Sequence, residues 1–148
     1  MANKMKYAFV VNRNAGKGSA VKKWTALEAR VAELFEDYSV VYDLAPIATD
    51  ADVVVAVGGD GTVHYVVNHL MRDNRHAALG ILPLGSGCDF ARNFETDDAL
   101  AVLARGETKA IDVGEIESAG NKMWFANVAD AGMGAEVTRQ MASHSRNY

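Results

Sequence analysis

Apolar residues along this chain follow two alternating periods, one typical of buried strands and the other typical of amphipathic helices. The run 53–57 is entirely apolar, as expected for a parallel strand that is buried on both faces. Apolar residues at the spacing of one helix face come soon afterwards: Val63, Val66, Val67, Leu70 and Met71. The residues between them, 58–62, include three glycines, so this stretch predicts a strand, a loop and a helix.

The same alternation recurs along the chain. Predicted strands cover 7–11, 39–42, 52–57 and 77–82. Ser19 is expected to cap a helix that carries one apolar face: Val21, Trp24, Leu27, Val31, Leu34 and Phe35. A helical turn at 90–94 and a helix at 97–105 are predicted further on. Together these elements predict an α/β fold: a three-layer, open, mostly parallel sheet with helices on both faces.

Two features depart from this simple alternation. Segments 110–117 and 122–129, joined by the turn-like residues 118–121, predict a terminal β-hairpin. Too few residues lie between Tyr42 and Asp52 for the helix that normally connects parallel strands. We therefore expect the strand at 39–42 to be peripheral, or an element of the sheet to have been lost.

Length and composition indicate one domain over residues 1–148. The chain is 49% hydrophobic and 23% charged, which is typical of globular domains. It has no apolar run of membrane-spanning length and no secretory leader, so a cytoplasmic protein without a transmembrane segment is expected. The single cysteine, Cys88, excludes an internal disulfide, and the four scattered histidines have no zinc-binding spacing.

Positive charge is concentrated near the N-terminus. Residues 1–30 hold seven Lys and Arg against the single acidic Glu28, while the whole chain has a net charge of -4. The excess of acid elsewhere argues against a nucleic-acid partner, whereas four early cations could attract a small polyanion. These cations are Arg13, Lys17, Lys22 and Lys23. For Lys22 and Lys23 a solvated helix face is an equally good interpretation.

The glycine loop at 58–62 has the features of an anion site. Small residues let a ligand approach the backbone, and the first N–H groups of the next helix lack partners within it. Asp60 would repel a bare phosphate, which suggests Mg²⁺ held through water and shared with phosphate oxygens. The structural alternative is that Asp60 and Thr62 only shape a turn and cap a helix. Glycine loops at 12–18 and 83–89 also follow predicted strands, so all three loops should share one edge of the sheet.

These motifs resemble the catalytic domain of the diacylglycerol kinase family, which includes bacterial lipid kinases and the sphingosine and ceramide kinases. The most specific parts are residues 58–62 with Asn68, and the segment 82–92. Asn12 with Gly16, and Asn127 with Gly132, match two weaker signatures. The loop at 58–62 alone would also suit NAD kinases and phosphofructokinases, whereas 82–92 favours the lipid kinases.

The resemblance implies that ATP and Mg²⁺ bind at these loops. The implied ATP-binding residues are Asn12, Arg13, Asn14, Ala15, Gly16, Gly58, Gly59, Asp60, Gly61, Thr62, Gly85, Ser86 and Gly87. Asp60 is expected to be the residue at the metal and the catalytic residue. Ser86 stands where threonine is usual, and Cys88 where asparagine is usual; we assign Cys88 no chemistry. Less usual residues for the family also stand at His64, Tyr65 and His69.

The family pairs this α/β domain with a β-sandwich domain that holds the lipid and supplies the general base, and this chain stops where that domain should begin. The resemblance thus implies the nucleotide-binding half of an ATP-dependent kinase for diacylglycerol or a sphingoid lipid, working at a membrane surface. One alternative is a non-catalytic nucleotide-binding or interaction module, covered by a partner or by a second copy in a homodimer. Another is an NAD kinase-like enzyme with a soluble substrate. A truncated kinase should expose apolar residues near Phe125, Val128 and Met133.

Overall fold

Four parallel strands form the centre of the protein. A computed structural model describes residues 5–43, 45–47, 50–73, 76–94 and 96–129. The strands are β1 (Tyr7–Val11), β2 (Tyr38–Tyr42), β3 (Val53–Gly58) and β4 (Ala78–Pro83). They pair in the order β2-β1-β3-β4, and all the pairings are parallel. This confirms the expected α/β class, with an open parallel sheet.

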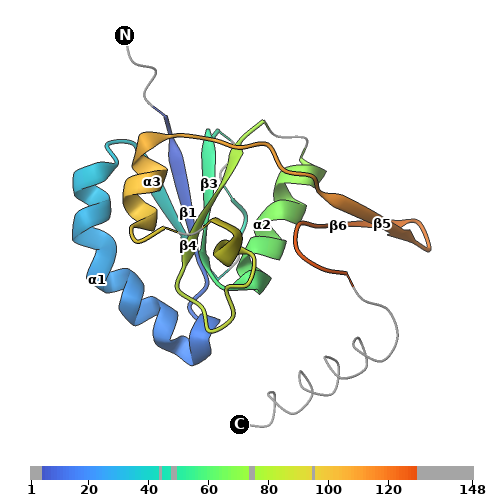
Figure 1. The fold of residues 1–148 in the computed structure, drawn as a ribbon, viewed down its shortest axis with the longest axis horizontal. Coiled ribbons are helices and arrows are strands. Elements are labelled where there is room, and N and C mark those ends of the chain that lie inside the picture. The colour runs from blue at the N-terminus through green and yellow to red at the C-terminus, as the bar shows by residue number, and fades with distance from the viewer. Residues whose placement is uncertain (1–4, 44, 48–49, 74–75, 95, 130–148) are drawn as a thin grey trace.

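The helices cover both faces of the sheet, as Figure 1 shows. Helix α1 (Ser19–Leu34) and helix α3 (Ala99–Arg105) lie on one face, and α2 (Asp60–Arg72) lies on the other. Side chains of a strand alternate between faces, so Phe9 packs against Trp24 of α1 while Val10 packs in the cluster of α2. Every residue of β1 and β3 is buried, which explains their unbroken apolar sequences.

The connection between β2 and β3 explains the missing crossover helix. Strand β2 lies at an edge of the sheet, so its connection to β3 has to pass over β1. Ile47 and Ala51 of this connection are buried in the same cluster as α2. The Tyr65 hydroxyl of α2 donates to the Ala45 carbonyl at 3.3 Å. The expectation of a peripheral strand is therefore confirmed, and the described residues of the connection, 45–47 and 50–52, are not helical.

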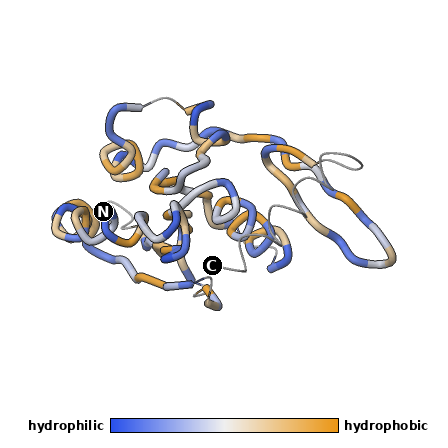
Figure 2. The backbone as a smooth tube through the Cα atoms, turned by 90° about the horizontal axis from the view of Figure 1, so that it is seen from below, coloured by the Kyte–Doolittle hydropathy of each residue, from blue (hydrophilic) through white to orange (hydrophobic). Residues whose placement is uncertain are grey.

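The predicted terminal hairpin is present. It consists of β5 (Gly114–Ser118) and β6 (Asn121–Phe125), which pair antiparallel. Figures 1 and 2 both show it projecting from the body of the domain beside α2, and along its length hydrophilic and hydrophobic stretches alternate. The strands are shorter than predicted because residues 110–113 and 126–129 make no ladder pairs. No helix in the described segments is long and apolar enough to cross a membrane.

Several local predictions at element ends were wrong. Ser19 is the first residue of α1 and not its cap; the N-cap is Gly18, which has a φ of 85°. The helical turn predicted at 90–94 is confirmed as the 3₁₀-helix η2 (Ala91–Phe94), whereas a second 3₁₀-helix before α1, η1 (Ala15–Gly18), was not predicted. Leu34 and Met71, assigned to apolar helix faces, are substantially exposed. Both lie at the C-terminal ends of their helices.

Replacing Phe9 should test the packing of α1 on the sheet. Its ring is fully buried and lies 5.4 Å from the Trp24 ring and 5.3 Å from the Phe35 ring, centroid to centroid. Phe9→Ala should lower the free energy of unfolding by about 3–5 kcal/mol, because it leaves a cavity. The measurement is urea denaturation, with the exposed Leu34→Ala as control. A loss no larger than that of the control would contradict this packing.

Candidate functional site at the carboxyl edge of the sheet

Three loops meet where the parallel strands end. The first loop (12–18) follows β1, the second loop (58–62) follows β3, and the third loop (83–90) follows β4. β1 connects to β2 on one side and β3 connects to β4 on the other, so the strand order reverses between β1 and β3. In open α/β sheets ligands bind at such a reversal, outside the carboxyl ends of the strands.

Asn12 joins the first loop to the second. Its backbone N–H donates to the Val57 carbonyl at 3.2 Å, and its amide nitrogen donates to Thr62 Oγ1 at 3.2 Å. The amide oxygen of Asn12 accepts the N–H of Asn14 at 3.1 Å, which fixes the start of the turn. Thr62 is buried, so its hydroxyl acts inside the structure and does not cap α2. Asn12 and Thr62 therefore set the relative positions of the two loops.

The second and third loops are in backbone contact. A Cβ on Gly85 would lie 2.5 Å from the Cα of Gly59, and a Cβ on Gly59 would lie 2.5 Å from the Gly87 carbonyl oxygen. The Leu84 N–H donates to the Gly58 carbonyl at 3.0 Å. Only glycine fits at 59 and 85 without moving one loop away from the other. These glycines thus allow the two loops to meet through their main-chain atoms.

Asp60 fastens the third loop to the start of α2. One carboxylate oxygen accepts the Asp89 N–H at 3.1 Å and the other accepts the Phe90 N–H at 3.0 Å. Asp60 therefore has the structural role that was considered for it, since it shapes a turn. That turn belongs to the third loop and not to its own loop. Each carboxylate oxygen can accept a further bond, so this contact leaves capacity for a ligand.

The described residues contain no group of three or more His, Cys, Asp or Glu that could hold a metal ion. Mg²⁺ binds through one or two carboxylates, several waters and substrate phosphates, and does not need a cage of protein ligands. The half-buried Asp60 carboxylate, with lone pairs left over, fits this mode. No other carboxylate is needed for that fit.

Arg13 of the first loop extends its side chain to the end of β2. Its Nε donates to Asp43 Oδ2 at 2.8 Å, and its guanidinium carbon lies 5.3 Å from the centre of the Tyr42 ring. The hydrogen bond from Arg13 holds the pKa of Asp43 below its usual value. Asp43 was not anticipated from the sequence, since nothing in its spacing marks it as a partner of Arg13. Arg13 as an ATP ligand remains a prediction.

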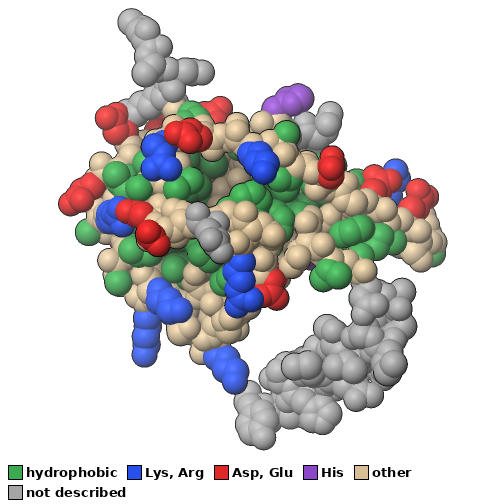
Figure 3. Space-filling view, in the orientation of Figure 1, with side chains coloured by type: hydrophobic (Ala, Val, Ile, Leu, Met, Phe, Trp, Pro, Cys, Tyr) green, Lys and Arg blue, Asp and Glu red, His purple; other side chains and the backbone are tan. Residues whose placement is uncertain are grey.

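Several residues in and beside the three loops are exposed to solvent. Five predicted ligand residues are exposed: Arg13, Asn14, Gly61, Ser86 and Gly87. Lys17, Lys22 and Lys23 are exposed too. Figure 3 shows Lys and Arg side chains gathered along the lower edge of the molecule, and Figure 1 places the carboxyl ends of the strands at that edge. The surroundings of the loops are therefore cationic, as the charge distribution in the sequence indicated.

Cys88 is held inward. Its thiol faces the Gly58 carbonyl at 3.7 Å and the Gly85 carbonyl at 3.6 Å. Burial raises the pKa of this thiol, and the charge of Asp60 adds to the increase. A hydrogen bond with the Gly85 backbone and the charges of Lys23 and Arg92 oppose this increase in pKa. The inert interpretation of Cys88 therefore agrees with its surroundings.

An open parallel sheet with three loops at its point of strand reversal defines the class: a three-layer α/β protein with its loops in contact at the carboxyl edge of the sheet. The chain belongs to the diacylglycerol kinase catalytic domain family, whose sequence profile matches residues 6–116.

Known proteins agree with this assignment. A Xanthomonas oryzae pv. oryzae protein named "Probable lipid kinase YegS-like" is 35% identical over 130 residues, which cover 82% of this chain and 41% of the relative. The Bacillus subtilis protein named "Diacylglycerol kinase" is 34% identical over 97 residues, which cover 62% of this chain and 31% of the relative. The chain thus spans less than half the length of these relatives.

A solved structure supports the fold. The crystal structure of a diacylglycerol kinase from Bacillus anthracis str. Sterne superimposes with a TM-score of 0.66 at 22% identity. The match covers 95% of this chain and 53% of that chain.

Substitution of two glycines should show how much the close contact between the second and third loops contributes to stability. Gly85→Ala should destabilise the protein by about 1–3 kcal/mol, because its Cβ would meet the Gly59 backbone. Gly61→Ala should be neutral or stabilising by about 0.4–1 kcal/mol, since nothing lies within 4 Å of its Cβ and it begins a helix. Thermal and urea denaturation measure both. Equal stabilities would show that the loops can separate at little cost.

The thiol of Cys88 should react slowly. Its raised pKa leaves less thiolate at neutral pH than an ordinary cysteine has, so alkylation by iodoacetamide should be slower in the folded protein than in urea. The difference should narrow as the pH rises through the thiol's pKa. A folded protein that reacts as fast as the unfolded chain near neutral pH would contradict the burial of this thiol.

Proposed function

We propose that this chain is the ATP-binding domain of a lipid kinase that phosphorylates the hydroxyl of a diacylglycerol or sphingoid-type lipid. The main support is the contact of three glycine-containing loops at the carboxyl edge of the sheet, in a chain of the diacylglycerol kinase family. The start of α2 lies at this loop contact, and a helix N-terminus favours an anion. Phosphates of ATP are the ligand that this chemistry and the family suggest together.

In this proposal the loops bind and position the nucleotide. Phosphoryl transfer depends mostly on positioning and on neutralising charge, so a main-chain cradle with nearby cations is suitable. The exposed Gly61, Ser86 and Gly87 would approach the phosphates, and Lys17 would add positive charge. Mg²⁺, when bound, would neutralise phosphate charge, and Asp60 would hold it through a free lone pair or through water.

The lipid-binding part of the proposed kinase would lie outside the described residues. Ile116 and Met123 of the hairpin have exposed fractions of 43% and 50%, and Val128, three residues after β6, is 74% exposed. Phe125 is half-buried, and Met133 of the predicted docking surface lies outside the described residues. We propose that this apolar surface receives the family's second domain, or a second copy of the chain. The complete enzyme would then meet its lipid from the cytoplasmic side, peripherally at a membrane.

A second candidate function is a nucleotide-binding module without catalysis. One observation favours it: both carboxylate oxygens of Asp60 already accept backbone N–H groups, so this residue has a complete structural role without a metal. In that case ATP would bind equally well with and without Mg²⁺. The two candidates therefore differ in the dependence of ATP affinity on Mg²⁺.

Calorimetric titration with ATP should decide between them. Wild type should bind ATP more tightly with Mg²⁺ than with EDTA, and Asp60→Ala should lose that difference, because the metal's protein anchor is gone. The matched control is Asp89→Ala, which removes an exposed carboxylate of the third loop that pairs with Arg92 of η2. A wild type that binds no ATP would refute the proposal, and equal affinity with Mg²⁺ and EDTA would favour the second candidate.

A further inference from the structure

Asn68 belongs to the motif that begins at the second loop, but it lies away from the loops. It is on α2, more than two turns after Asp60, and it is only 6% exposed. A buried amide has to be hydrogen-bonded to be tolerated, so its partners indicate what it does. Those partners belong to the β-hairpin and to α2 itself.

The amide of Asn68 binds the backbone of one residue in β6. Its Nδ2 donates to the Trp124 carbonyl at 2.7 Å, and its Oδ1 accepts the Trp124 N–H at 3.0 Å. Nδ2 also donates to the His64 carbonyl at 2.9 Å, one turn earlier on α2. An N–H and a C=O of a single strand residue are thus paired by one side chain, as a neighbouring strand would pair them.

The strand register agrees with this role. Trp124 lies opposite Glu115 in the hairpin. Since both backbone groups of Trp124 point to Asn68, this pair must be one whose backbones do not bond each other across the hairpin. Side chains are closest in such pairs, and the Trp124 Nε1 donates to Glu115 Oε2 at 2.9 Å. Asn68 therefore occupies the outer edge of β6, where a further strand would otherwise pair.

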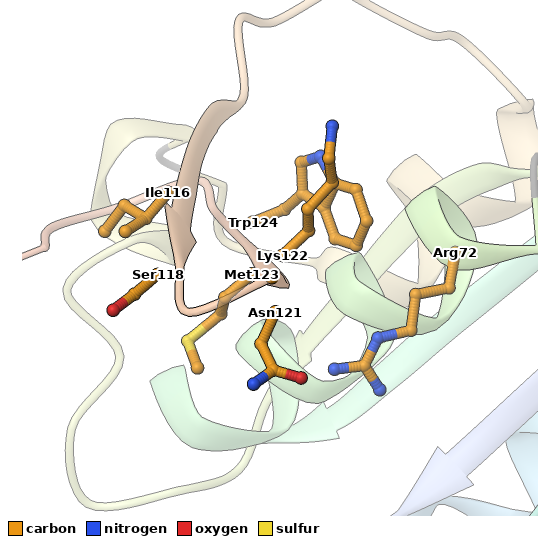
Figure 4. A pocket seen from close by; sticks show the side chains of 8 residues that line it. Arg72, Ile116, Ser118, Asn121, Lys122, Met123 and Trp124 are labelled. Atoms are coloured by element: carbon orange, nitrogen blue, oxygen red, sulfur yellow. The ribbon is translucent and has the colours of Figure 1, made fainter.

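The hairpin is less closely packed further from Asn68. A hollow of about 640 Å³ lies between its outer part and Arg72, near the end of α2. Figure 4 shows Asn121, Met123 and Trp124 on the hairpin, with Arg72 facing them across the hollow from α2. Trp124 packs against the apolar cluster under α2, while Ile116 and Met123 are largely exposed. The base of the hairpin is thus the part that is fastened.

We infer that Asn68 is a positioning residue that fixes β6 to α2, and so sets where the chain beyond Phe125 lies relative to the second loop. Helix α2 begins at the proposed phosphate site and carries Asn68 on its buried side. The consequence for catalysis rests on the proposed function, in which the chain after β6 would lead to the lipid-binding part. Asn68 would then hold the two halves of the enzyme at a fixed distance without touching either substrate.

Residue-resolved amide exchange can test the attachment in this chain. Asn68→Ala should increase the exchange rate of the Trp124 N–H by about tenfold or more, since a lost bond of this kind changes an opening equilibrium by that order. The N–H groups of Met123 and Phe125 point toward β5 and should keep more of their protection. Amides of β1 and β3 should be unchanged. The control is Asn121→Ala, an exposed amide of β6 that should leave every rate as in wild type.

A second variant guards against a folding defect. Asn68→Asp keeps the size and an acceptor for the Trp124 N–H, but it puts a buried carboxylate oxygen against the Trp124 and His64 carbonyls in place of a donor, so the hairpin should loosen by at least as large a factor as in Asn68→Ala. Spin labels on Ser118→Cys and Lys22→Cys, with Cys88→Ser, should report a broader distance distribution in both Asn68 variants. Unchanged Trp124 exchange and distances would overturn the inference, and so would equal acceleration in the central sheet.

The ATP titration separates this inference from the proposed function. Asn68→Ala should keep the ATP affinity of wild type, because the contacts among the three loops are untouched. A hairpin that stays attached while ATP affinity falls would mean that Asn68 acts on the loops, which overturns the inference. If wild type binds no ATP, the proposed function fails, while the exchange and distance measurements still decide whether Asn68 positions β6.

Discussion

The parallel pairing of β1 with β3 is the constraint on which the rest of the structure depends. Both strands are buried on both faces, so each face needs a cover of apolar side chains. Helices α1 and α3 supply one cover, and α2 with the connection around Ile47 supplies the other. Parallel pairing also brings the carboxyl ends of the strands to one edge, and this is why three separate glycine loops come into contact.

The contact among the loops at that edge is made mainly by backbone. The closest approaches join Gly59 to Gly85 and Gly87, and the side chains of Asn12 and Asp60 hold the loops together. In the proposed function such a site would recognise an anion through a helix N-terminus and nearby cations, without a fixed cluster of charged ligands. The same arrangement explains why Asp60 can have a structural role and still be available to a cation.

The hairpin extends the argument from the loops to the remainder of the protein. Helix α2 starts at the second loop, and its buried Asn68 takes the place of a strand beside Trp124. A helix cannot pair with a strand edge through its own backbone, because its N–H and C=O groups are used internally. One amide side chain supplies both a donor and an acceptor, so it can perform that pairing. The position of β6 is therefore linked to the position of the glycine loop.

Much of this architecture was predictable from the sequence alone. The apolar run before Gly58 and the periodic residues after Thr62 determined the strand, loop and helix, and the turn at 118–121 determined the hairpin. Periodicity records only which residues avoid water, so it could not place the helix ends at Leu34 and Met71, which are exposed. Residue type alone misplaced the cap of α1, which is Gly18 and not Ser19. Tertiary structure alone decided the ion pair of Arg13 with Asp43, the use of Asp60 on the third loop, and the pairing of Asn68 with Trp124. Each joins residues far apart in sequence, and only the packing of the sheet brings such residues within bonding distance.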